Sequence, residues 1–232
     1  MTETPNTRSR APARLQRQTM AGQVADELRQ KILAGDYAEG EQLLQEQLAA
    51  DFGISKVPVR EALHLLEAEG LIVQQFHRGA VIASLAPEQL MEIFELRTQI
   101  EVWLLGLAME NATEADCAMA RSMNDALGAD TDPVKGWDLN WKFHEALYLP
   151  ANKPYVLDHL RILHSRTARY VRKQYDIATN RAQILDQHSE ILDAYAQRDP
   201  KAQELLAQHI LGAARTLTDH LITLRTSAVG QE

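Results

Sequence analysis

The sequence predicts a mostly helical fold in two parts: a winged helix-turn-helix with a small β-hairpin wing, then an all-helical antiparallel bundle of six helices. Three observations support this prediction. Three apolar repeats at helical spacing each end at a glycine, namely Gly35, Gly53 and Gly70. Two short β-prone runs then flank a tight turn. From Pro87 to the end of the chain, the apolar residues recur only at helical spacing.

Residues 1–18 predict a disordered basic tail, because Pro5 and Pro12 interrupt any helix and Glu3 is the only acid. The alternative is a mobile arm that touches phosphates. The four basic residues of this segment are Arg8, Arg10, Arg14 and Arg17.

Residues 19–86 predict the helix-turn-helix and its wing. Thr19 suits the N-cap of a first helix, and Ser55 suits the N-cap of a third, with a short second helix over 44–52 between them. The runs 71–76 and 80–83 follow as strands, and the tight turn His77-Arg78-Gly79 joins them.

Residues 87–228 predict the bundle, with helices at about 88–110, 113–128, 133–149, 153–176, 180–198 and 200–226. Thr113 and Asp116 suit the capped start of the second of these helices. Proline-containing breaks separate the later ones: Asp132-Pro133, Asn152-Lys153-Pro154 and Asp199-Pro200.

Composition excludes several classes of protein. With 232 residues, 45% hydrophobic and 24% charged, the chain is an ordinary globular mix. No apolar run approaches the ~20 residues of a membrane helix. The single cysteine, Cys117, rules out a disulfide framework within one chain, so we expect a cytoplasmic protein. A net charge of −8 argues against bulk electrostatic binding of nucleic acid, so any DNA contact must be local.

The start of the third predicted helix carries candidate DNA contacts, because the second helix of a helix-turn-helix motif enters the major groove. Ser55 and the free amides at the helix start suit a phosphate, and Lys56 and Arg60 share one helix face. The candidates at this helix and at the wing tip are Ser55, Lys56, Val57, Arg60, His77, Arg78 and Gly79.

Residues 19–86 resemble the GntR family of regulators. The similarity lies in three stretches: LRQKILAG at 28–35, SKVPVREAL at 55–63 and LEAEGLI at 66–72. It implies that the third helix and the wing tip contact DNA. Two positions depart from the family pattern: Gln47 and Lys56 stand where arginine occurs in some or most members, and lysine lacks the bidentate fork of arginine.

The predicted bundle concentrates histidines on helices that must pack together. Asn140 and His144 are four residues apart and share a face, while His188 and His209 lie on the last two helices. Three imidazoles and one oxygen suit zinc, nickel or a related divalent ion. His164 and His220 are rival ligands for His209, and structural histidines without a metal are the other interpretation.

The segment 87–226 is similar to the ligand-binding (FCD-type) domain of the FadR subgroup of GntR regulators, through NWKFH at 140–144, NKPYVL at 152–157 and the stretch 188–199. The resemblance implies a metal held by Asn140, His144, His188 and His209. Asn140 replaces the usual aspartate and brings no negative charge, so metal affinity should be lower. The spacing from Asp199 to His209 is one residue shorter than the pattern.

The resemblance also implies a small organic-acid effector that binds the metal through its carboxylate. Arginine side chains would hold the same carboxylate by paired hydrogen bonds. The candidate effector residues are Arg97, Glu101, Arg166 and Arg169. Arg97 and Glu101 are also spaced as an ion pair that braces the helix, which remains the alternative.

Together these observations predict a homodimeric transcriptional regulator, more often a repressor, that binds a two-fold symmetric operator. A metal-dependent helical-bundle enzyme is the rival from another class. The sequence lacks an HExxH motif, a glycine-rich phosphate loop and a nucleophile motif, so we expect no enzyme. A regulator with a metal-free effector pocket is the second rival.

Overall fold

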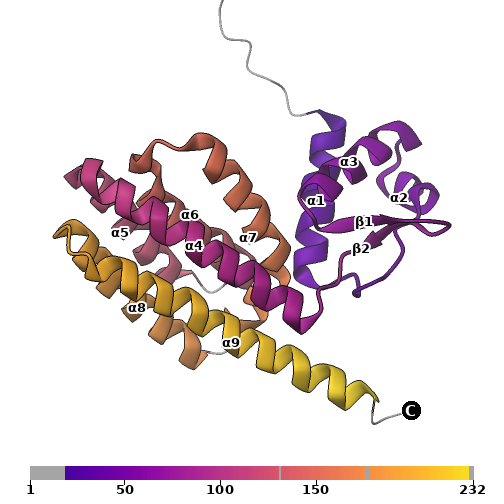
Figure 1. The fold of residues 1–232 in the computed structure, drawn as a ribbon. Helices are drawn as coiled ribbons and strands as arrows, with labels where there is room; N and C mark the ends of the chain where they lie inside the picture. Colours follow the sequence, from indigo (N-terminus) through magenta and orange to yellow (C-terminus); the bar gives the residue numbers. More distant parts are fainter. Residues whose placement is uncertain (1–18, 131, 176–177, 230–232) are drawn as a thin grey trace, which may run out of the picture.

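The computed structural model describes residues 19–130, 132–175 and 178–229, so the predicted basic tail lies outside the described residues. Within them the chain forms nine α-helices, one 3-10 helix (Leu149–Ala151) and one two-stranded antiparallel sheet. The predicted mostly helical fold with a hairpin wing is therefore confirmed. The N-terminal elements gather at one end of the elongated helical bundle (Figure 1).

The N-terminal region consists of three helices and a hairpin. Thr19 begins the first helix, because its side chain accepts a hydrogen bond from the Gly22 amide at 3.1 Å. Gly35 ends it in the left-handed conformation, with a φ of 85°. The elements are α1 (Met20–Ala34), α2 (Gln45–Phe52), α3 (Lys56–Ala68), β1 (Ile72–Gln75) and β2 (Gly79–Ile82).

The hairpin is anchored to the connection between α1 and α2. β1 and β2 pair in register from Ile72 opposite Ile82 to Gln75 opposite Gly79. Gln42 forms an isolated bridge with Val81, and the Leu43 amide donates to the Ala80 carbonyl at 2.9 Å. The connection thus pairs through its backbone with β2 and fixes the orientation of the hairpin relative to α1 and α2.

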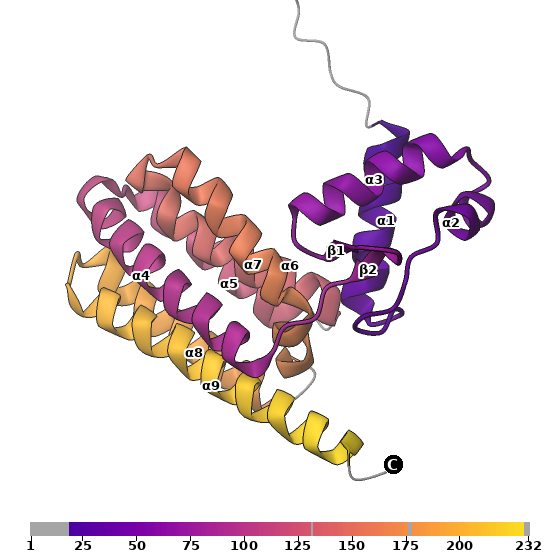
Figure 2. The same cartoon turned by 45° about the vertical axis from the view of Figure 1, so that its right-hand side comes forward.

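The remaining helices form the bundle. Helix α4 lies along α9 in both views, and α5 packs against α6 and α8 (Figures 1 and 2). Thr113 and Asp116 form the predicted capping box at the start of α5. The elements are α4 (Pro87–Asn111), α5 (Glu114–Ala129), α6 (Pro133–Tyr148), α7 (Pro154–Tyr175), α8 (Ala178–Ala196) and α9 (Lys201–Val229).

The apolar interior is divided into two clusters, one in each region. The bundle cluster is the larger and contains Phe94, Phe143 and Tyr195 among its fully buried side chains. The N-terminal cluster contains Leu28, Leu63 and other residues of α1 to β2, but also Ala168 of α7, which is 0% exposed. A bundle helix therefore completes the core of the N-terminal region.

Candidate functional sites on the N-terminal face and in the bundle core

The first turns of α3 present the predicted contact residues to solvent. Ser55 occupies the N-cap position without a side-chain cap bond, so its hydroxyl is not used by the helix. Val57 is 53% exposed and Arg60 is exposed, whereas Val59 between them is fully buried. The helix is thus anchored by one face and displays its polar face, as a groove-binding helix must.

Lys56 is exposed but not free. Its ammonium group forms an ion pair with the Glu46 carboxylate of α2. The hydrogen bond from Lys56 lowers the pKa of Glu46, so this acid is ionised at neutral pH. The pair neutralises part of the positive charge at the start of α3, whereas Arg60 is exposed.

The wing tip is exposed from Val73 to Gly79, and the predicted residues His77, Arg78 and Gly79 all lie on it. The Arg78 guanidinium turns back, donating to the Gly40 carbonyl at 3.0 Å and the Gln75 side chain at 3.2 Å. The Gln42 side chain donates to the Arg78 carbonyl. Arg78 therefore fixes the hairpin tip to the loop between α1 and α2.

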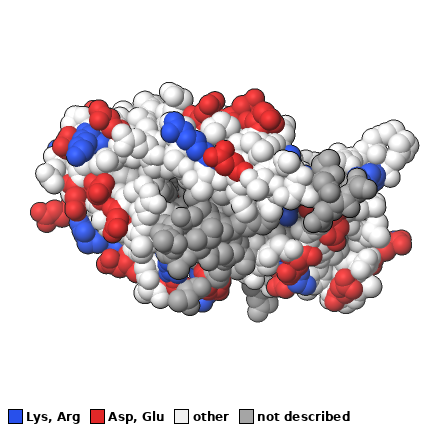
Figure 3. All heavy atoms as spheres, turned by 90° about the horizontal axis from the view of Figure 1, so that it is seen from below, with Lys and Arg blue, Asp and Glu red and all other residues white. Residues whose placement is uncertain are grey.

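Charge is dispersed on the face of the molecule that Figure 3 shows. On the face seen in Figure 3, lysine and arginine are interspersed with aspartate and glutamate rather than gathered. The net charge of −8 and this mixture give no bulk attraction to DNA, so binding to DNA requires local contacts.

Three histidines from three helices meet in the bundle core. The structure brings His144 of α6, His188 of α8 and His209 of α9 together, each offering a ring nitrogen, and these atoms lie within 4.8 Å of one another. His144 and His188 are buried, and His209 is partly buried. Such a set of imidazoles is the donor arrangement that zinc and related ions prefer.

Each of these imidazoles uses Nδ1 for a protein hydrogen bond. His188 pairs with Asn124 Oδ1 at 3.0 Å and His209 with Gln187 Oε1 at 2.9 Å, while His144 lies 3.3 Å from the Tyr148 hydroxyl. Nε2 of His188 is buried without a partner. Partners on Nδ1 fix the ring orientation and leave Nε2 for a ligand, as around known metal sites.

Burial keeps the three histidines neutral. It lowers the pKa of His144 and His188 well below the ordinary value, and a proton on a neighbouring histidine would lower it further. Burial and the Arg97 charge lower the pKa of His209 to about 4. Only the neutral imidazole binds a metal, so at pH 7 the cluster is in the ligand form.

Two further polar groups beside the cluster lack partners. Oδ1 of Asn140 and both ring nitrogens of His164 are buried without a hydrogen bond. Both residues line a cavity of about 180 Å³ together with His144, His209 and Arg97. Unpaired buried polar atoms are costly and rare, so the donor set fits a bound ion with Asn140 oxygen beside it.

Arg97 reaches the cavity from α4, but its charge is compensated. Its Nε donates to Glu101 at 2.8 Å, and Nη1 lies 3.4 Å from the Thr167 hydroxyl. The Tyr148 hydroxyl donates to the other Glu101 oxygen at 2.6 Å. Both members of the pair are buried, so the ion pair that the spacing predicted is present, and Arg97 also lines the cavity.

Three other predicted candidates lie elsewhere. Arg166 and Arg169 do not line the cavity, which corrects the expectation that they join Arg97 around one carboxylate. Arg169 donates to the Tyr37 carbonyl at 3.3 Å, and the Arg166 side chain lies directly against Gly70, where it leaves no room for a Cβ. His220 is exposed and outside the histidine cluster, whereas its rival His209 lies within it.

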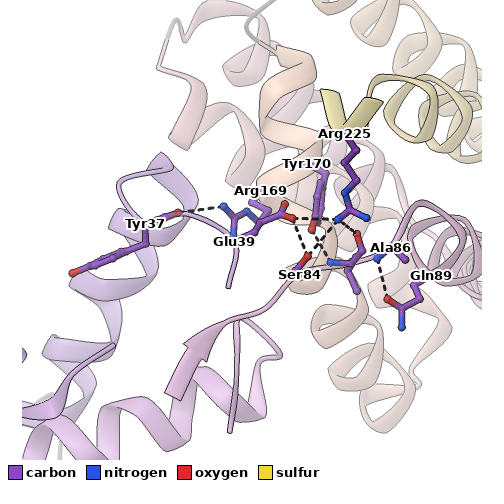
Figure 4. Close-up of polar contacts among 9 residues, drawn as sticks. Tyr37, Glu39, Ser84, Ala86, Gln89, Arg169, Tyr170 and Arg225 are labelled. Atoms are coloured by element: carbon purple, nitrogen blue, oxygen red, sulfur yellow. Dashed lines mark hydrogen bonds and ion pairs between the residues drawn. The ribbon is translucent and has the colours of Figure 1, made fainter. Parts of the chain in front are cut away.

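Arg169 belongs instead to a joint between the two regions, which we define as the contacts of Tyr37, Glu39, Ser84 and Leu85 with Arg169, Tyr170 and Arg225 (Figure 4). The Leu85 amide donates to the Tyr170 hydroxyl at 2.9 Å, and Arg225 donates to the Leu85 carbonyl at 2.8 Å. Burial raises the pKa of Tyr170 to about 12, so the phenol stays neutral.

Sequence reasoning did not identify the residues around the histidines. Tyr148 follows His144 by four positions, so helical spacing was a usable signal for it. Asn124 and Gln187 reach their histidines from other positions in the fold, and nothing in their local sequence marks them.

Comparison with known proteins identifies both regions. Residues 20–82 match the model of the bacterial regulatory proteins of the gntR family, and residues 92–213 match the FCD domain. The chain belongs to the GntR family of regulators and carries an FCD domain. It is therefore a DNA-binding transcriptional regulator and not an enzyme, as predicted.

Relatives and solved structures of this GntR family protein cover most of its length. It is 30% identical over 196 residues to the transcriptional repressor GlaR of Escherichia coli, covering 79% of this chain and 89% of that protein. It is 30% identical over 199 residues to a gluconate operon repressor of Bacillus licheniformis, covering 80% and 79%. The E. coli McbR/YncC structure has a TM-score of 0.70 at 23% identity, covering 88% and 99%.

In the part of the chain that the structure describes, no helix is long and apolar enough to cross a membrane.

Proposed function

We propose that this GntR family protein is a homodimeric repressor of the FadR subgroup whose operator binding is controlled by a small organic acid bound at a divalent metal ion. One observation carries the proposal: three imidazoles, two of them buried, offer ring nitrogens within 4.8 Å of one another, beside a cavity that Arg97 also lines. This combination offers a cation site and an anion partner around one cavity.

His144, His188 and His209 would hold the metal, zinc or nickel by the chemistry of the donors, with the Asn140 oxygen as a fourth ligand. The bound ion would supply positive charge for a carboxylate. All four protein donors are neutral, so the ion keeps its full charge and is held less tightly than by a set with a carboxylate. Asn140→Asp should therefore raise metal affinity, by about tenfold for the added charge at close range.

The effector would lie in the cavity, with its carboxylate between the metal and Arg97. His164, whose two ring nitrogens have no partner, offers a hydrogen bond to a further polar group of the effector. One relative is named for a gluconate operon, and gluconate is a hydroxy acid of this chemical class. A volume of about 180 Å³ limits the effector to a small metabolite, because pockets for drug-sized ligands measure about 300–1,000 Å³.

We assign operator binding to residues 19–86 and effector binding and dimerisation to residues 87–228, in a cytoplasmic protein. Two copies would present two α3 helices to the half-sites of a symmetric operator. The exposed apolar residues Leu96 and Trp103, seven positions apart on one face of α4, suit a contact between copies.

Helix α7 is the route by which effector binding would reach the DNA-binding region. His164 lines the cavity and Thr167 lies beside Arg97, while Arg169 and Tyr170, one turn further on, form the joint. An effector that binds one arrangement of α7 more tightly than another shifts the population between them. Tyr170→Phe removes one joint contact without touching the cavity, so it should weaken release from DNA while leaving effector affinity unchanged.

The first test is the metal content of protein purified without chelator or nickel affinity resin, measured by elemental mass spectrometry. We expect about one equivalent of zinc or nickel per chain, and loss of that metal in His188→Ala. The matched control is His220→Ala, because His220 is an exposed histidine outside the cluster. Absence of metal from the wild type, even after adding zinc or nickel, would contradict the metal site. The alternative would then be a regulator that binds its effector in a metal-free pocket.

The second test is a screen of small carboxylates against the metal-loaded protein by thermal shift. A hit should raise the midpoint in the wild type and lose its effect in Arg97→Lys, which keeps the charge but loses the paired hydrogen bonds. The same compound should release the protein from its operator. Stabilisation without release would contradict effector control.

A further inference from the structure

We infer that Phe76 at the wing tip makes an apolar contact with DNA, packing against deoxyribose at the edge of the minor groove beside the recognition helix. Phe76 is 89% exposed, the most exposed of the large apolar side chains in the described residues. A ring that is this exposed in the free protein has most of its apolar surface left to bury against a partner.

The position of Phe76 points to DNA as that bound state. It directly follows β1 and precedes His77, at the end of the hairpin that projects away from the bundle (Figure 1). The start of α3, where Arg60 is exposed, lies in the same N-terminal region, at the end of the molecule far from α8 (Figure 2). When α3 lies in the major groove, a hairpin that projects from the same end of the molecule can reach the neighbouring backbone or groove.

The tip is held in shape before any partner binds. Arg78 donates to Gly40 and Gln75, and Gln42 donates to the Arg78 carbonyl, so the turn is fixed from both sides. The Phe76 ring packs edge-on against the His77 ring, with centroids 4.0 Å apart. His77 itself adopts a φ of 64°, which directs the turn outward. A preformed contact loses little conformational entropy on binding.

The chemistry of the tip favours sugar rather than phosphate. The guanidinium of Arg78, the only cation between residues 72 and 82, is already engaged with Gly40 and Gln75. The leading group is therefore an aromatic ring, which cannot neutralise a phosphate but can bury apolar surface against deoxyribose. Architectural DNA-binding proteins also place apolar side chains in the minor groove, although there they are inserted between base steps.

The two kinds of contact differ in their salt dependence, which provides the test. A duplex of about 30 base pairs is first selected from a random library by the wild-type protein, and its affinity is followed from about 50 to about 200 mM salt. We expect Phe76→Ala to weaken binding about tenfold at every salt concentration, because apolar burial releases no counterion. Phe76→Leu, which keeps apolar surface, should retain most of the affinity.

The matched control is Tyr155→Ala. Tyr155 is 75% exposed and also packs against a histidine ring, at 4.3 Å from His159, but it lies on α7 in the bundle. The Tyr155→Ala substitution should leave DNA affinity unchanged. Phe76 contributes nothing to the core, so far-UV circular dichroism and the thermal midpoint should be those of the wild type in all three variants.

Hydroxyl-radical footprinting locates the contact, because the radical attacks deoxyribose. We expect Phe76→Ala to lose protection only at sugars flanking each half-site, with protection at the centre of the half-sites intact. If Phe76→Ala bound DNA as tightly as the wild type, the inference would be overturned, and a protein would be the remaining partner for Phe76. A shallower salt dependence would also overturn it, because the loss would then come from a displaced charge.

Discussion

The two candidate sites of this protein, the exposed α3 and wing tip and the histidine cluster in the bundle core, differ in the physical basis of ligand binding. The start of α3 and the wing tip are exposed, and their charges are balanced by water or by neighbours such as Glu46. In the histidine cluster His144 and His188 are buried and the imidazoles are kept neutral, and unpaired polar atoms of His188, Asn140 and His164 lie in or beside it. The exposed site therefore depends on salt, whereas the buried site depends on pH and on the ligand that satisfies its unpaired atoms.

The largest effect is expected when one imidazole is removed from the buried site. We expect His144→Ala to weaken zinc binding by more than about a hundredfold, because even loss of a group that only orients a ligand costs 10–100-fold. Zinc titration against a competing chelator measures it. DNA binding by the metal-free protein should not change, and equal zinc affinity in the variant would exclude His144 as a ligand.

At the exposed site, Arg60→Ala should weaken operator binding by about 1–3 kcal/mol and reduce the salt slope by about one if Arg60 also meets a phosphate. The fold should be intact, because the side chain is exposed and α3 is anchored by Val59 and Leu63. Fluorescence anisotropy with the selected duplex gives both quantities. An unchanged affinity would remove Arg60 from the interface.

Acid should affect the buried site first. The folded pKa of His144 and His188 is lowered, and that of His209 is about 4, so the unfolded chain binds more protons between that value and about 6.5. The metal-free protein should have a constant thermal midpoint above pH ~6.5 and lose stability as the pH falls toward ~4.

Acidic side chains do not account for this window. Their unfolded pKa values lie near 4, so a carboxylate such as Asp116, whose pKa is lowered by Thr113, loses its contribution only below that range. Differential scanning fluorimetry at a series of pH values tests the prediction. A midpoint that stays constant from pH 7 down to ~4.5 would contradict it.

The smallest expected effect is at the Lys56–Glu46 pair. Glu46→Gln removes a negative charge near the DNA and frees Lys56, so operator affinity should rise about two- to threefold and the salt slope should steepen. Glu114→Gln, at the far end of the bundle on α5, is the control and should have no effect. A decrease in affinity would contradict this prediction, because the ion pair would then orient Lys56 for DNA binding instead of competing with DNA for it.

Most of the fold was predictable because it is built from local signals. Glycines at the ends of α1 and α2, the cap at Thr19 and the capping box at Thr113 each act within one helical turn, and the structure uses them as predicted. Apolar periodicity then set the six bundle helices to within a few residues.

The candidate sites were predictable only where the needed residues follow from helical spacing or resemblance. The three histidines were identified, and the structure brings them together. Arg166 and Arg169 were expected beside Arg97, but consecutive turns of α7 face different neighbours, and only packing determines which neighbour each one meets. The ion pair of Lys56 and the inward turn of Arg78 are likewise long-range contacts that no local pattern encodes.

Ala168 has a consequence for how this protein can be divided. This residue of α7 is fully buried within the N-terminal cluster, beneath residues that come some hundred positions earlier in the chain. A fragment that stops at residue 86 would lack that methyl group and the helix behind it, and would expose apolar surface to water. Fragments of this protein, and chimeras in which the bundle is exchanged, must therefore keep the contact between Ala168 and the N-terminal cluster. The sequence of one region thus constrains the sequence of the other.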